Sequence, residues 1–513
     1  MLLIYPPLAK PCEPPAGIAH LAGALRENDL HCTLLDANLE GLLFLLESAA
    51  EPKDTWGRRA YRNLEANLAS LRSRELYTNQ DRYRRAVADV NRILELAGLE
   101  KKISLSLANY QDPSLSPLKS GDLLLAAGQP EHNIFHAYFS KRLRELLAEE
   151  RPNLLGFSLN YLSQAITTFA MIGFVKETAP TLPVVLGGGL VTSWLSNPSW
   201  KNPFSGLIDH LVPGPGEKAL LHLLGRQDSL NHHRPDFDDL PLGDYLAPGF
   251  ILPYAASSGC YWNKCSFCPE KAEKNPYTSS STDRVLNDID RLKQRTNPAM
   301  LHFLDNAISP ALLRALASIP PDVDWYGFAR VHHALADVDF CMALRKSGCV
   351  MLKLGLESGN QDILDSMNKG IDLDMVAQAL TALSSAGIGT YVYLLFGTPS
   401  ESIVQARDTL DFVVDHADAI TYLNLAIFNM PICSPEADPL EVSGFFEGDL
   451  SLYTDFFHPH GWSRKAIRRF LDHEFKRHPA VASILRRDPP HFTSNHAPFF
   501  VGNLSGKCRG HNA

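Results

Sequence analysis

The first half of the chain alternates short apolar runs with segments in which apolar residues recur at helical spacing. The apolar runs, which are typical of buried strands, cover residues 2–5, 32–35, 154–159, 184–186 and 208–212. Helical spacing follows the first run, at Ile18, Leu21, Ala22 and Leu25. This order, with glycines after the later runs, predicts a doubly wound parallel sheet whose ligands bind at the carboxyl ends of its strands.

A second alternation begins after residue 250. Its strand candidates are residues 251–256, 301–304, 325–329, 351–356, 390–396 and 421–428. Six such units, most of them separated by helical stretches, predict an incomplete parallel barrel with its site at the C-terminal ends of the strands. The preceding residues 227–250 are polar and contain several Asp and Pro residues, so we interpret them as the domain linker.

These patterns predict an α/β chain with three parts. Residues 1–235 form a Rossmann-like domain with a helical insertion at about 51–130, residues 236–435 form a partial (β/α)6 barrel, and residues 436–513 form a small, mostly helical C-terminal region. This last region is rich in histidine, at His458, His460, His473, His478, His491, His496 and His511. Their spacing matches no metal-binding motif, so we expect no histidine metal site there.

The charge balance argues against some classes of protein. The 513 residues contain 48 Lys and Arg against 57 Asp and Glu, a net charge of −9, with 45% hydrophobic and 20% charged residues. This composition is ordinary for a globular protein and argues against a nucleic-acid or anionic-membrane binder. No stretch approaches the about 20 apolar residues of a membrane span, and no signal peptide is evident, so we expect a cytoplasmic protein.

Residues 51–102 depart from this balance. They hold 12 Lys and Arg against 8 Asp and Glu, and Leu64, Leu68 and Leu71 fall on one helix face. Two interpretations of this local positive charge remain open: a solvated helical hairpin, or a docking surface for an acidic partner.

Three of the nine cysteines lie close together, directly after the first strand of the second half. Cys260, Cys265 and Cys268 have the spacing C-x4-C-x2-C. Three thiolates on one loop suit an iron–sulfur cluster and leave one iron open, whereas a structural zinc site normally takes four ligands. We expect buried, structural roles for the scattered cysteines, which are Cys12, Cys32, Cys341, Cys349, Cys433 and Cys508.

At these cysteines the sequence resembles the radical S-adenosylmethionine (SAM) superfamily. The usual spacing there is C-x3-C-x2-C with an aromatic residue before the last cysteine, which is Phe267 here. The extra residue between Cys260 and Cys265 is a departure, and it resembles a "GCYW" variant of the motif. The resemblance implies a [4Fe–4S] cluster whose open iron chelates SAM, reductive cleavage to a 5′-deoxyadenosyl radical, and an external electron donor such as flavodoxin or ferredoxin.

The resemblance also implies residues that contact SAM. Lys353 to Gly359, followed by Met367 to Gly370, is similar to the fourth-strand motif of the family, in which Glu357 and Ser358 would bind SAM's polar groups. A helix N-cap is the alternative role for this Glu-Ser-Gly sequence. Four more residues complete the predicted SAM site. One is Phe267 of the cysteine motif, and three lie at strand ends: Asp305 and Arg330, each a SAM contact or a structural ion pair, and Gly397, which leaves room for the adenosyl group.

Across residues 1–435 the order of domains resembles the cobalamin-binding subgroup of this superfamily. The residues that this resemblance assigns to cobalamin are Pro7, Asn38, Ser158, Gly187, Gly188, Gly189, Gly214, Gly216 and Glu217. The Asp-x-His-x-x-Gly motif is absent, and residues 36–41 are a near match with Asn in place of His. The resemblance therefore implies cobalamin without a histidine below cobalt, and the alternative is an empty Rossmann-like scaffold.

The leading function implied by the resemblance is a cobalamin-dependent radical SAM methyltransferase that acts on an unactivated carbon of a metabolite, peptide or protein side chain. A second hypothesis keeps both cofactors but has rearrangement, cyclisation or oxidation as its outcome. A third is a cobalamin-free enzyme similar to methylthiotransferases, which is disfavoured because those have three further N-terminal cysteines and this chain has only Cys12 and Cys32. A fourth is a non-enzymatic iron–sulfur scaffold or redox-sensing protein.

Overall fold

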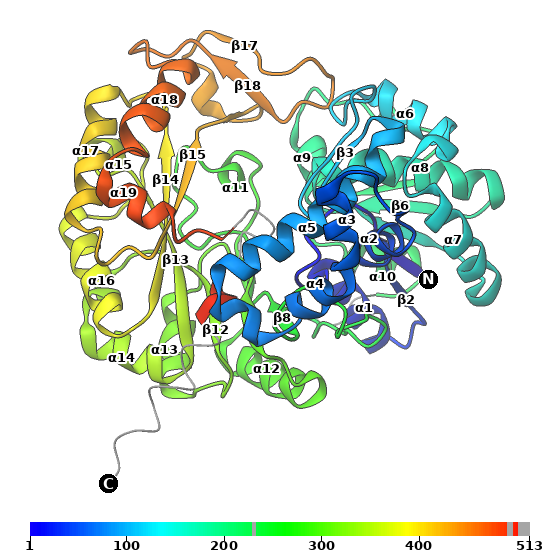
Figure 1. Cartoon of the computed structure of the whole chain (residues 1–513), viewed down its shortest axis with the longest axis horizontal. Coiled ribbons are helices and arrows are strands. Elements are labelled where there is room, and N and C mark those ends of the chain that lie inside the picture. Colours follow the sequence, from blue (N-terminus) through cyan, green and yellow to red (C-terminus); the bar gives the residue numbers. More distant parts are fainter. Residues whose placement is uncertain (228–231, 490–495, 501–513) are drawn as a thin grey trace. The chain divides into compact units, whose positions relative to one another are not determined.

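The computed structural model describes residues 1–227, 232–489 and 496–500, which form two compact units (Figure 1). Unit 1 contains residues 1–251 and 446–452, and unit 2 contains residues 252–445 and the later described segments. The domain boundaries expected at 235 and 435 stay predictions. Cys508, His491 and His511, which entered the sequence analysis, lie outside the described residues.

Unit 1 is built on a parallel sheet of five strands. The strands run in the order β2-β1-β5-β6-β7, and their bounds are Leu2–Tyr5 (β1), Thr33–Asp36 (β2), Leu155–Ser158 (β5), Val184–Gly187 (β6) and His210–Val212 (β7). The order reverses direction between β1 and β5. This arrangement confirms the doubly wound sheet, and it places a topological switch point beside the carboxyl ends of β1 and β5.

Helices cover this sheet, and a mainly helical insertion separates β2 from β5. The flanking helices are Ala16–Glu27 (α1), Ala37–Glu47 (α2), His136–Glu150 (α7), Leu162–Thr178 (α8), Gly189–Ser196 (α9) and Glu217–Leu223 (α10). The insertion contains Thr55–Arg62 (α3), Leu64–Leu71 (α4), Gln80–Gly98 (α5), a short hairpin of Ser104–Leu105 (β3) with Tyr110–Gln111 (β4), and Ser120–Gly128 (α6). Gly173 of α8 allows close packing here, since a Cβ at this position would lie 1.8 Å from the carbonyl oxygen of Ala127 in α6.

The segment interpreted as a linker packs against unit 1. Asp236 donates its backbone N–H to the carbonyl of Ala19 in α1, over 2.9 Å, and its carboxylate lies 2.9 Å from Arg26. Tyr245 donates its hydroxyl to Asp36 over 2.7 Å. These contacts fix the described part of the segment on α1 and on the end of β2, so it is part of unit 1 and not a free tether.

Unit 2 is built on a sheet of six strands in the order β15-β14-β13-β12-β11-β8. The strands are Ile251–Tyr254 (β8), Met300–Phe303 (β11), Trp325–Ala329 (β12), Cys349–Glu357 (β13), Gly389–Phe396 (β14) and Tyr422–Ile427 (β15). Neighbouring strands from β11 to β15 are parallel. All six strands agree within two residues with the runs that the sequence predicts, and the partial barrel is confirmed.

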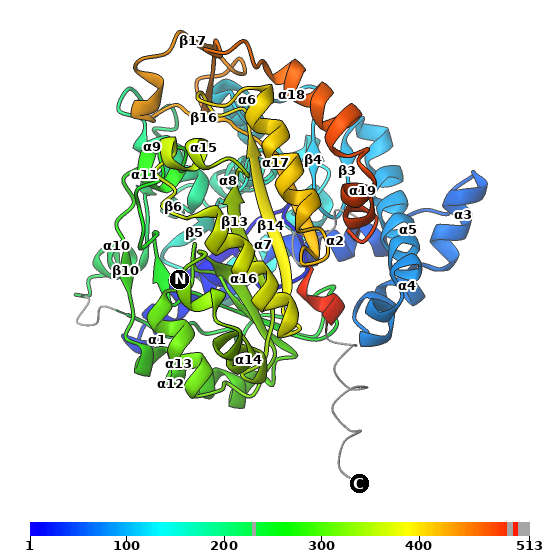
Figure 2. The same ribbon diagram turned by 90° about the vertical axis from the view of Figure 1, so that its left-hand side faces the viewer.

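Helices lie along the outer face of this sheet. They are Thr282–Thr296 (α12), Pro310–Ser318 (α13), Val338–Lys346 (α14), Gln361–Ser366 (α15), Leu373–Ser385 (α16) and Ile403–Asp415 (α17). α16 and α17 run beside β13 and β14 in both views (Figure 2). Because these strands are parallel, their carboxyl ends lie along one edge of the sheet, which is where site residues are expected.

The C-terminal part of unit 2 combines helices with a small sheet. Arg464–Phe470 (α18), a π-helical turn at Leu471–Phe475 and Pro479–Leu485 (α19) form its helical part, as expected. An antiparallel sheet that the sequence analysis did not predict joins Met430–Pro431 (β16), Tyr453–Phe456 (β18) and Val442–Gly444 (β17). Among the described residues, no helix has the length and apolar character that crossing a membrane requires.

Candidate functional site

The cysteine loop (residues 259–268) follows β8 and the short segment of residues 255–258. Asp305, which follows β11, accepts hydrogen bonds from the backbone N–H of Ala256, over 3.0 Å, and from the hydroxyl of Ser257. The Asp305 carboxyl is 2% exposed, and burial raises its pKa although these hydrogen bonds oppose the rise. Both oxygens of Asp305 thus bind the chain just before the cysteine loop, and contact with SAM stays a prediction for this residue.

The three cysteines lie between the short strand Ser257–Ser258 (β9) and the helical turn Pro269–Ala272 (α11), without disulfides. Cys265 is buried, whereas Cys260 and Cys268 are partly exposed. In the described part of the chain, no group of three His, Cys, Asp or Glu side chains is placed to hold one metal ion. Three cysteine thiols suit a four-iron cluster with one open iron, whereas a structural zinc site normally takes four ligands.

Trp262, in the long spacer between the first two cysteines, packs against the loop of residues 367–370 that follows α15. Its indole N–H donates to the carbonyl of Asn368 over 2.9 Å. A Cβ on Gly370 would lie 2.1 Å from indole atom Cζ2, and Gly370 has a positive φ of 63°, so glycine is required there. Ser266 also donates its backbone N–H to the carbonyl of Met367, over 2.9 Å. The cysteine loop is therefore bound to a loop about a hundred residues further along the chain.

Arg330, which follows β12, links these two loops. Its guanidinium carbon lies 4.3 Å from the centroid of the Trp262 ring, and its Nη1 lies 3.9 Å from the sulfur of Cys265. The other terminal nitrogen donates to the carbonyl of Lys369. Burial raises the pKa of the Cys265 thiol, and the charges of Lys369 and Arg330 oppose that rise. Two cations therefore favour the thiolate form that an iron ligand needs.

Glu357, at the end of β13, forms an ion pair with Lys369. The Nζ of Lys369 lies 2.8 Å from Oε1 of Glu357, and both side chains are mostly buried. Lys369 also lies 5.4 Å from the ring centroid of Phe267. A Cβ on Gly355 would lie 2.6 Å from Glu357 Oε1, so glycine there makes room for the pair. The structure thus brings together Glu357 and the loop that supports the cysteines.

Ser358 and Gly397 have partners within unit 2. Ser358 is fully buried, with its Oγ 3.2 Å from the hydroxyl of Thr409, and the N-cap of α15 is Asn360. Gly397 has a φ of 86° and donates its N–H to the carboxylate of Glu401. The N-cap alternative for Ser358 is therefore not observed, and the roles of Ser358 and Gly397 in SAM binding stay predictions.

In unit 1, the residues assigned to cobalamin lie at the carboxyl ends of the strands of the five-stranded sheet, or directly after them. Asn38 is 1% exposed, and its side-chain oxygen accepts the N–H of Ala9 over 2.8 Å. The hydroxyl of Ser158 accepts from the side chain of Asn160 over 3.0 Å. The sheet brings the ends of β1, β2, β5 and β6 to one edge, as the sequence predicts, but Asn38 serves the chain itself.

The glycines at the carboxyl edge of the five-stranded sheet have different surroundings. A Cβ on Gly188 would lie 2.4 Å from the carbonyl oxygen of Leu159, so the chain itself requires glycine there. A Cβ on Gly189 would be in ordinary van der Waals contact with Asn160, at 3.8 Å, whereas one on Gly214 would meet nothing within 4 Å. The chain therefore leaves space beside Gly214, although its positive φ of 65° by itself favours glycine. Ligand binding by the other assigned residues, which are Pro7, Gly187, Gly188, Gly216 and Glu217, stays a prediction.

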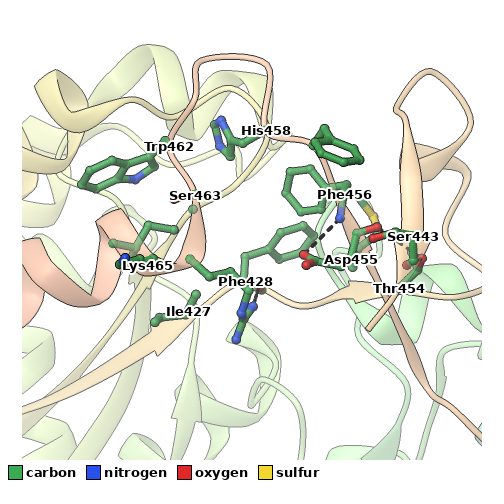
Figure 3. Close-up of a pocket in the computed structure, with 15 residues that line it drawn as sticks. Ile427, Phe428, Ser443, Thr454, Asp455, Phe456, His458, Trp462, Ser463 and Lys465 are labelled. Carbon is green, nitrogen blue, oxygen red and sulfur yellow. Dashed lines mark hydrogen bonds between the residues drawn. The ribbon is translucent and has the colours of Figure 1, made fainter. Parts of the chain in front are cut away.

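A pocket of about 300 Å³ lies at the carboxyl ends of β14 and β15 (Figure 3). Behind its wall, Glu401 is fully buried and accepts hydrogen bonds from the N–H of Gly397 and, over 3.0 Å, from the indole of Trp462. Burial raises the pKa of Glu401 to about 7, and the two hydrogen bonds only partly oppose this rise. This carboxyl group, which the sequence analysis did not single out, joins the end of β14 to the C-terminal segment.

Comparison with known proteins agrees with the resemblance of residues 254–413 in unit 2 to the radical SAM superfamily. Residues 254–413 match the model of the radical SAM superfamily. An uncharacterized methyltransferase of Pyrococcus horikoshii is 25% identical over 233 residues, which cover 41% of this chain and 50% of the relative. The hopanoid C-3 methylase of Methylococcus capsulatus is 26% identical over 294 residues, which cover 51% of this chain and 55% of the relative. The chain thus spans about half the length of these curated relatives.

Both units take part in one structural similarity. The radical SAM methyltransferase TsrM of Kitasatospora setae, solved with tryptophan and a SAM analogue, has a TM-score of 0.54 and 16% sequence identity. The alignment covers 95% of this chain and 89% of TsrM. A second structure of TsrM contains cobalamin and a [4Fe–4S] cluster. At this identity the similarity establishes a shared fold.

Replacing Trp262 with Ala should loosen the cysteine loop. The substitution removes the indole that contacts Gly370 and stacks on Arg330, a contact of about 0.5–1.5 kcal/mol. We expect iron release from the reconstituted protein to a chelator to become roughly threefold to tenfold faster. Trp56→Ala is the matched control, since Trp56 also stacks with an arginine, Arg92 at 5.0 Å, but lies in unit 1. Equal release by both variants would contradict the role of Trp262.

Replacing Glu401 with Gln should change how stability depends on pH. Folding raises the pKa of Glu401 to about 7. The stability that Glu401 adds to the folded state is therefore fully present below its unfolded pKa and is lost as the pH rises through 7. Between pH 5 and 8 we expect the wild type to lose about 3 kcal/mol of stability relative to Glu401→Gln. Thermal unfolding at both pH values measures this, and parallel profiles for the two proteins would contradict it.

Proposed function

We propose that this chain, whose residues 254–413 form a radical SAM domain, is a cobalamin-dependent radical SAM methyltransferase that acts on an unactivated carbon. One observation carries the proposal: a radical SAM domain and a doubly wound parallel unit occur in one chain, which shares the fold of a radical SAM methyltransferase over 95% of its length. The methyltransferases among the relatives with similar sequence support the same reaction type.

Cys260, Cys265 and Cys268 would hold a [4Fe–4S] cluster, which supplies the electron for the reductive cleavage of SAM. The protein's part is to keep the three sulfurs on one supported loop. Trp262 and Ser266 bind that loop to residues 367–370, and Arg330 places a positive charge 3.9 Å from the sulfur of Cys265. A nearby cation stabilises the anionic form of this ligand.

Glu357 would bind SAM together with Lys369. A carboxylate at the end of a central strand accepts charge-assisted hydrogen bonds from an ammonium group, and such bonds are short and strong. The ion pair with Lys369 fixes the Glu357 carboxylate and leaves its second oxygen without a protein donor among the described residues. Gly397, which follows the neighbouring strand, would border the adenosyl group.

Cobalamin would bind at the carboxyl edge of the sheet in unit 1, and it supplies a cobalt centre that carries a methyl group. Gly189 and Gly214, with Ser158 at the end of β5, would face it. Asn38, which stands where the motif of other cobalamin proteins has histidine, already accepts a hydrogen bond from Ala9. The residues assigned to cobalamin include no histidine.

The cobalamin-free alternative, a reaction like that of methylthiotransferases, is less well supported. Ribosomal protein uS12 methylthiotransferases are among the relatives, at 23% and 26% identity. Cys12 and Cys32, the two N-terminal cysteines, are both buried, and burial raises the pKa of the Cys32 thiol to about 12. The methylthiotransferase pattern has three further N-terminal cysteines, and the sequence supplies only these two.

The reaction needs a reductant and a substrate. As the sequence analysis expects, the reductant in the proposal is an external donor such as flavodoxin or ferredoxin, and the protein works in the cytoplasm. The substrate is a metabolite, a peptide or a protein side chain.

The proposal is tested by methyl transfer from labelled SAM. Anaerobic, cluster-loaded and cobalamin-loaded protein is reduced and incubated with cell extract and SAM that carries a deuterated methyl group. We expect 5′-deoxyadenosine and a product heavier by the label, both absent when Cys260, Cys265 and Cys268 are replaced with Ala. Formation of 5′-deoxyadenosine with an unlabelled, rearranged or oxidised product would contradict methyl transfer. It would favour the second hypothesis, in which both cofactors serve a rearrangement, cyclisation or oxidation.

A further inference from the structure

The pocket at the carboxyl ends of β14 and β15 belongs entirely to unit 2. Gly397 and Phe428, which directly follow these two strands, form one part of its wall, and residues 454–467 of the C-terminal segment form another. Ligand sites of parallel barrels form at this edge, in loops that follow the strands. The pocket is therefore in the position at which a barrel enzyme receives a small molecule.

Three hydrogen bonds hold the C-terminal segment on the strand ends. His458 lies 2.9 Å from the carbonyl oxygen of Thr398, and Trp462 donates to Glu401 over 3.0 Å. Arg464 donates to the carbonyl of Phe428 over 2.8 Å. These bonds make the pocket largely pre-formed, which is usual for small-molecule sites and lowers the cost of binding.

Aromatic rings dominate the pocket. The rings of Phe428 and Phe456 meet edge to face, with centroids 6.1 Å apart, and His458 lies 5.7 Å from Phe456. Figure 3 shows Phe428, Phe456, His458 and Trp462 around one space. Phe457 also lines the pocket and is 64% exposed, so its ring is accessible to a ligand. A flat aromatic ring is the ligand group that pairs with such walls.

Positive charge borders the same space. Lys465 lines the pocket, is exposed, and forms no ion pair within the described part of the chain. Arg464 is a second lining cation, whereas Asp455, on the opposite side in Figure 3, is the one acidic residue in the lining. The pocket thus carries a net positive charge, with a free ammonium group on one side. An anionic group would be attracted to that side.

We propose that this pocket binds the methyl acceptor and selects a molecule with a flat aromatic ring and an anionic group, the ring packed against the aromatic wall of Phe428, Phe456 and Phe457 and the anion beside Lys465. The proposal rests on the proposed function, because it assigns the acceptor of the transferred methyl group. Its recognition step, however, needs neither SAM nor a reductant and can be measured separately.

A pair of probes of equal shape tests this assignment. Binding of 2-naphthoate and of the neutral 2-naphthamide to the anaerobic, cluster-loaded full-length protein is measured by equilibrium dialysis. We expect 2-naphthoate to bind more tightly. Lys465→Gln should weaken its binding about threefold and leave 2-naphthamide unchanged, as expected for an exposed charge pair. Arg469→Gln, on the same helix but outside the pocket lining, is the matched control and should change neither.

Two further variants separate the charge from the rings. Asp455→Asn removes the lining carboxylate and should strengthen the binding of 2-naphthoate, whereas Phe457→Ala should weaken both probes by roughly twofold to tenfold. Equal affinity for the two probes, or a 2-naphthoate affinity unchanged in Lys465→Gln, would overturn the proposal. In the same preparations, 5′-deoxyadenosine formed from reduced enzyme and SAM reports on the proposed function. A pocket that binds as expected without SAM cleavage, or the reverse, therefore shows which of the two has failed.

Discussion

The contact between the cysteine loop and residues 367–370 is the constraint on which the candidate site of unit 2 depends. Three thiols on a loop have no fixed arrangement by themselves. Here the indole of Trp262 fills the space that Gly370 leaves, and Arg330 bonds to Lys369 while it lies beside Cys265. Lys369 in turn pairs with Glu357 at the end of β13. The cluster residues and the expected SAM residue therefore share one support.

This contact also accounts for the unusual cysteine spacing. The fragment Cys260 to Cys265 has one residue more than the common motif, and Trp262 is the residue in it that reaches the second loop. Arg330 stacks on the ring of Trp262 and donates a hydrogen bond to the carbonyl of Lys369. Both contacts hold its positive charge near the sulfur of Cys265. Charges and hydrogen bonds near the sulfurs are among the factors that set the reduction potential of iron–sulfur clusters. The departure from the motif thus has a physical consequence for the site.

Local patterns predicted much of the fold, and long-range contacts account for what they missed. Strand β12 occupies the predicted residues 325–329 because an apolar run bounded by polar residues is a local signal. The pairing of Glu357 with Lys369 depends on a turn, and the contact of Trp262 with Gly370 joins residues far apart in sequence. No periodicity carries that information.

Glycines and linkers show the same limit of local signals. The resemblance in the sequence assigns Gly188 to cobalamin binding, but the close approach of the Leu159 carbonyl is sufficient to require glycine there. Residues 232–250 have the composition of a linker, yet they pack on α1, where a Cβ on Gly23 would lie 1.9 Å from the carbonyl oxygen of Arg234. The polar composition of this segment did not predict its packing on α1, because the packing depends on contacts with residues far away in the sequence.

The central claim is that one chain holds an iron–sulfur cluster in unit 2 and cobalamin in unit 1. Iron and cobalt per chain, measured after anaerobic reconstitution and gel filtration, test it most directly. The account predicts about four irons and one cobalt in the wild type. Replacing the three loop cysteines with Ala should remove the iron and leave the cobalt, whereas Gly189→Phe, which adds a large ring just after β6, should do the reverse. Loss of both metals in either variant, or no cobalt in the wild type, would contradict the account.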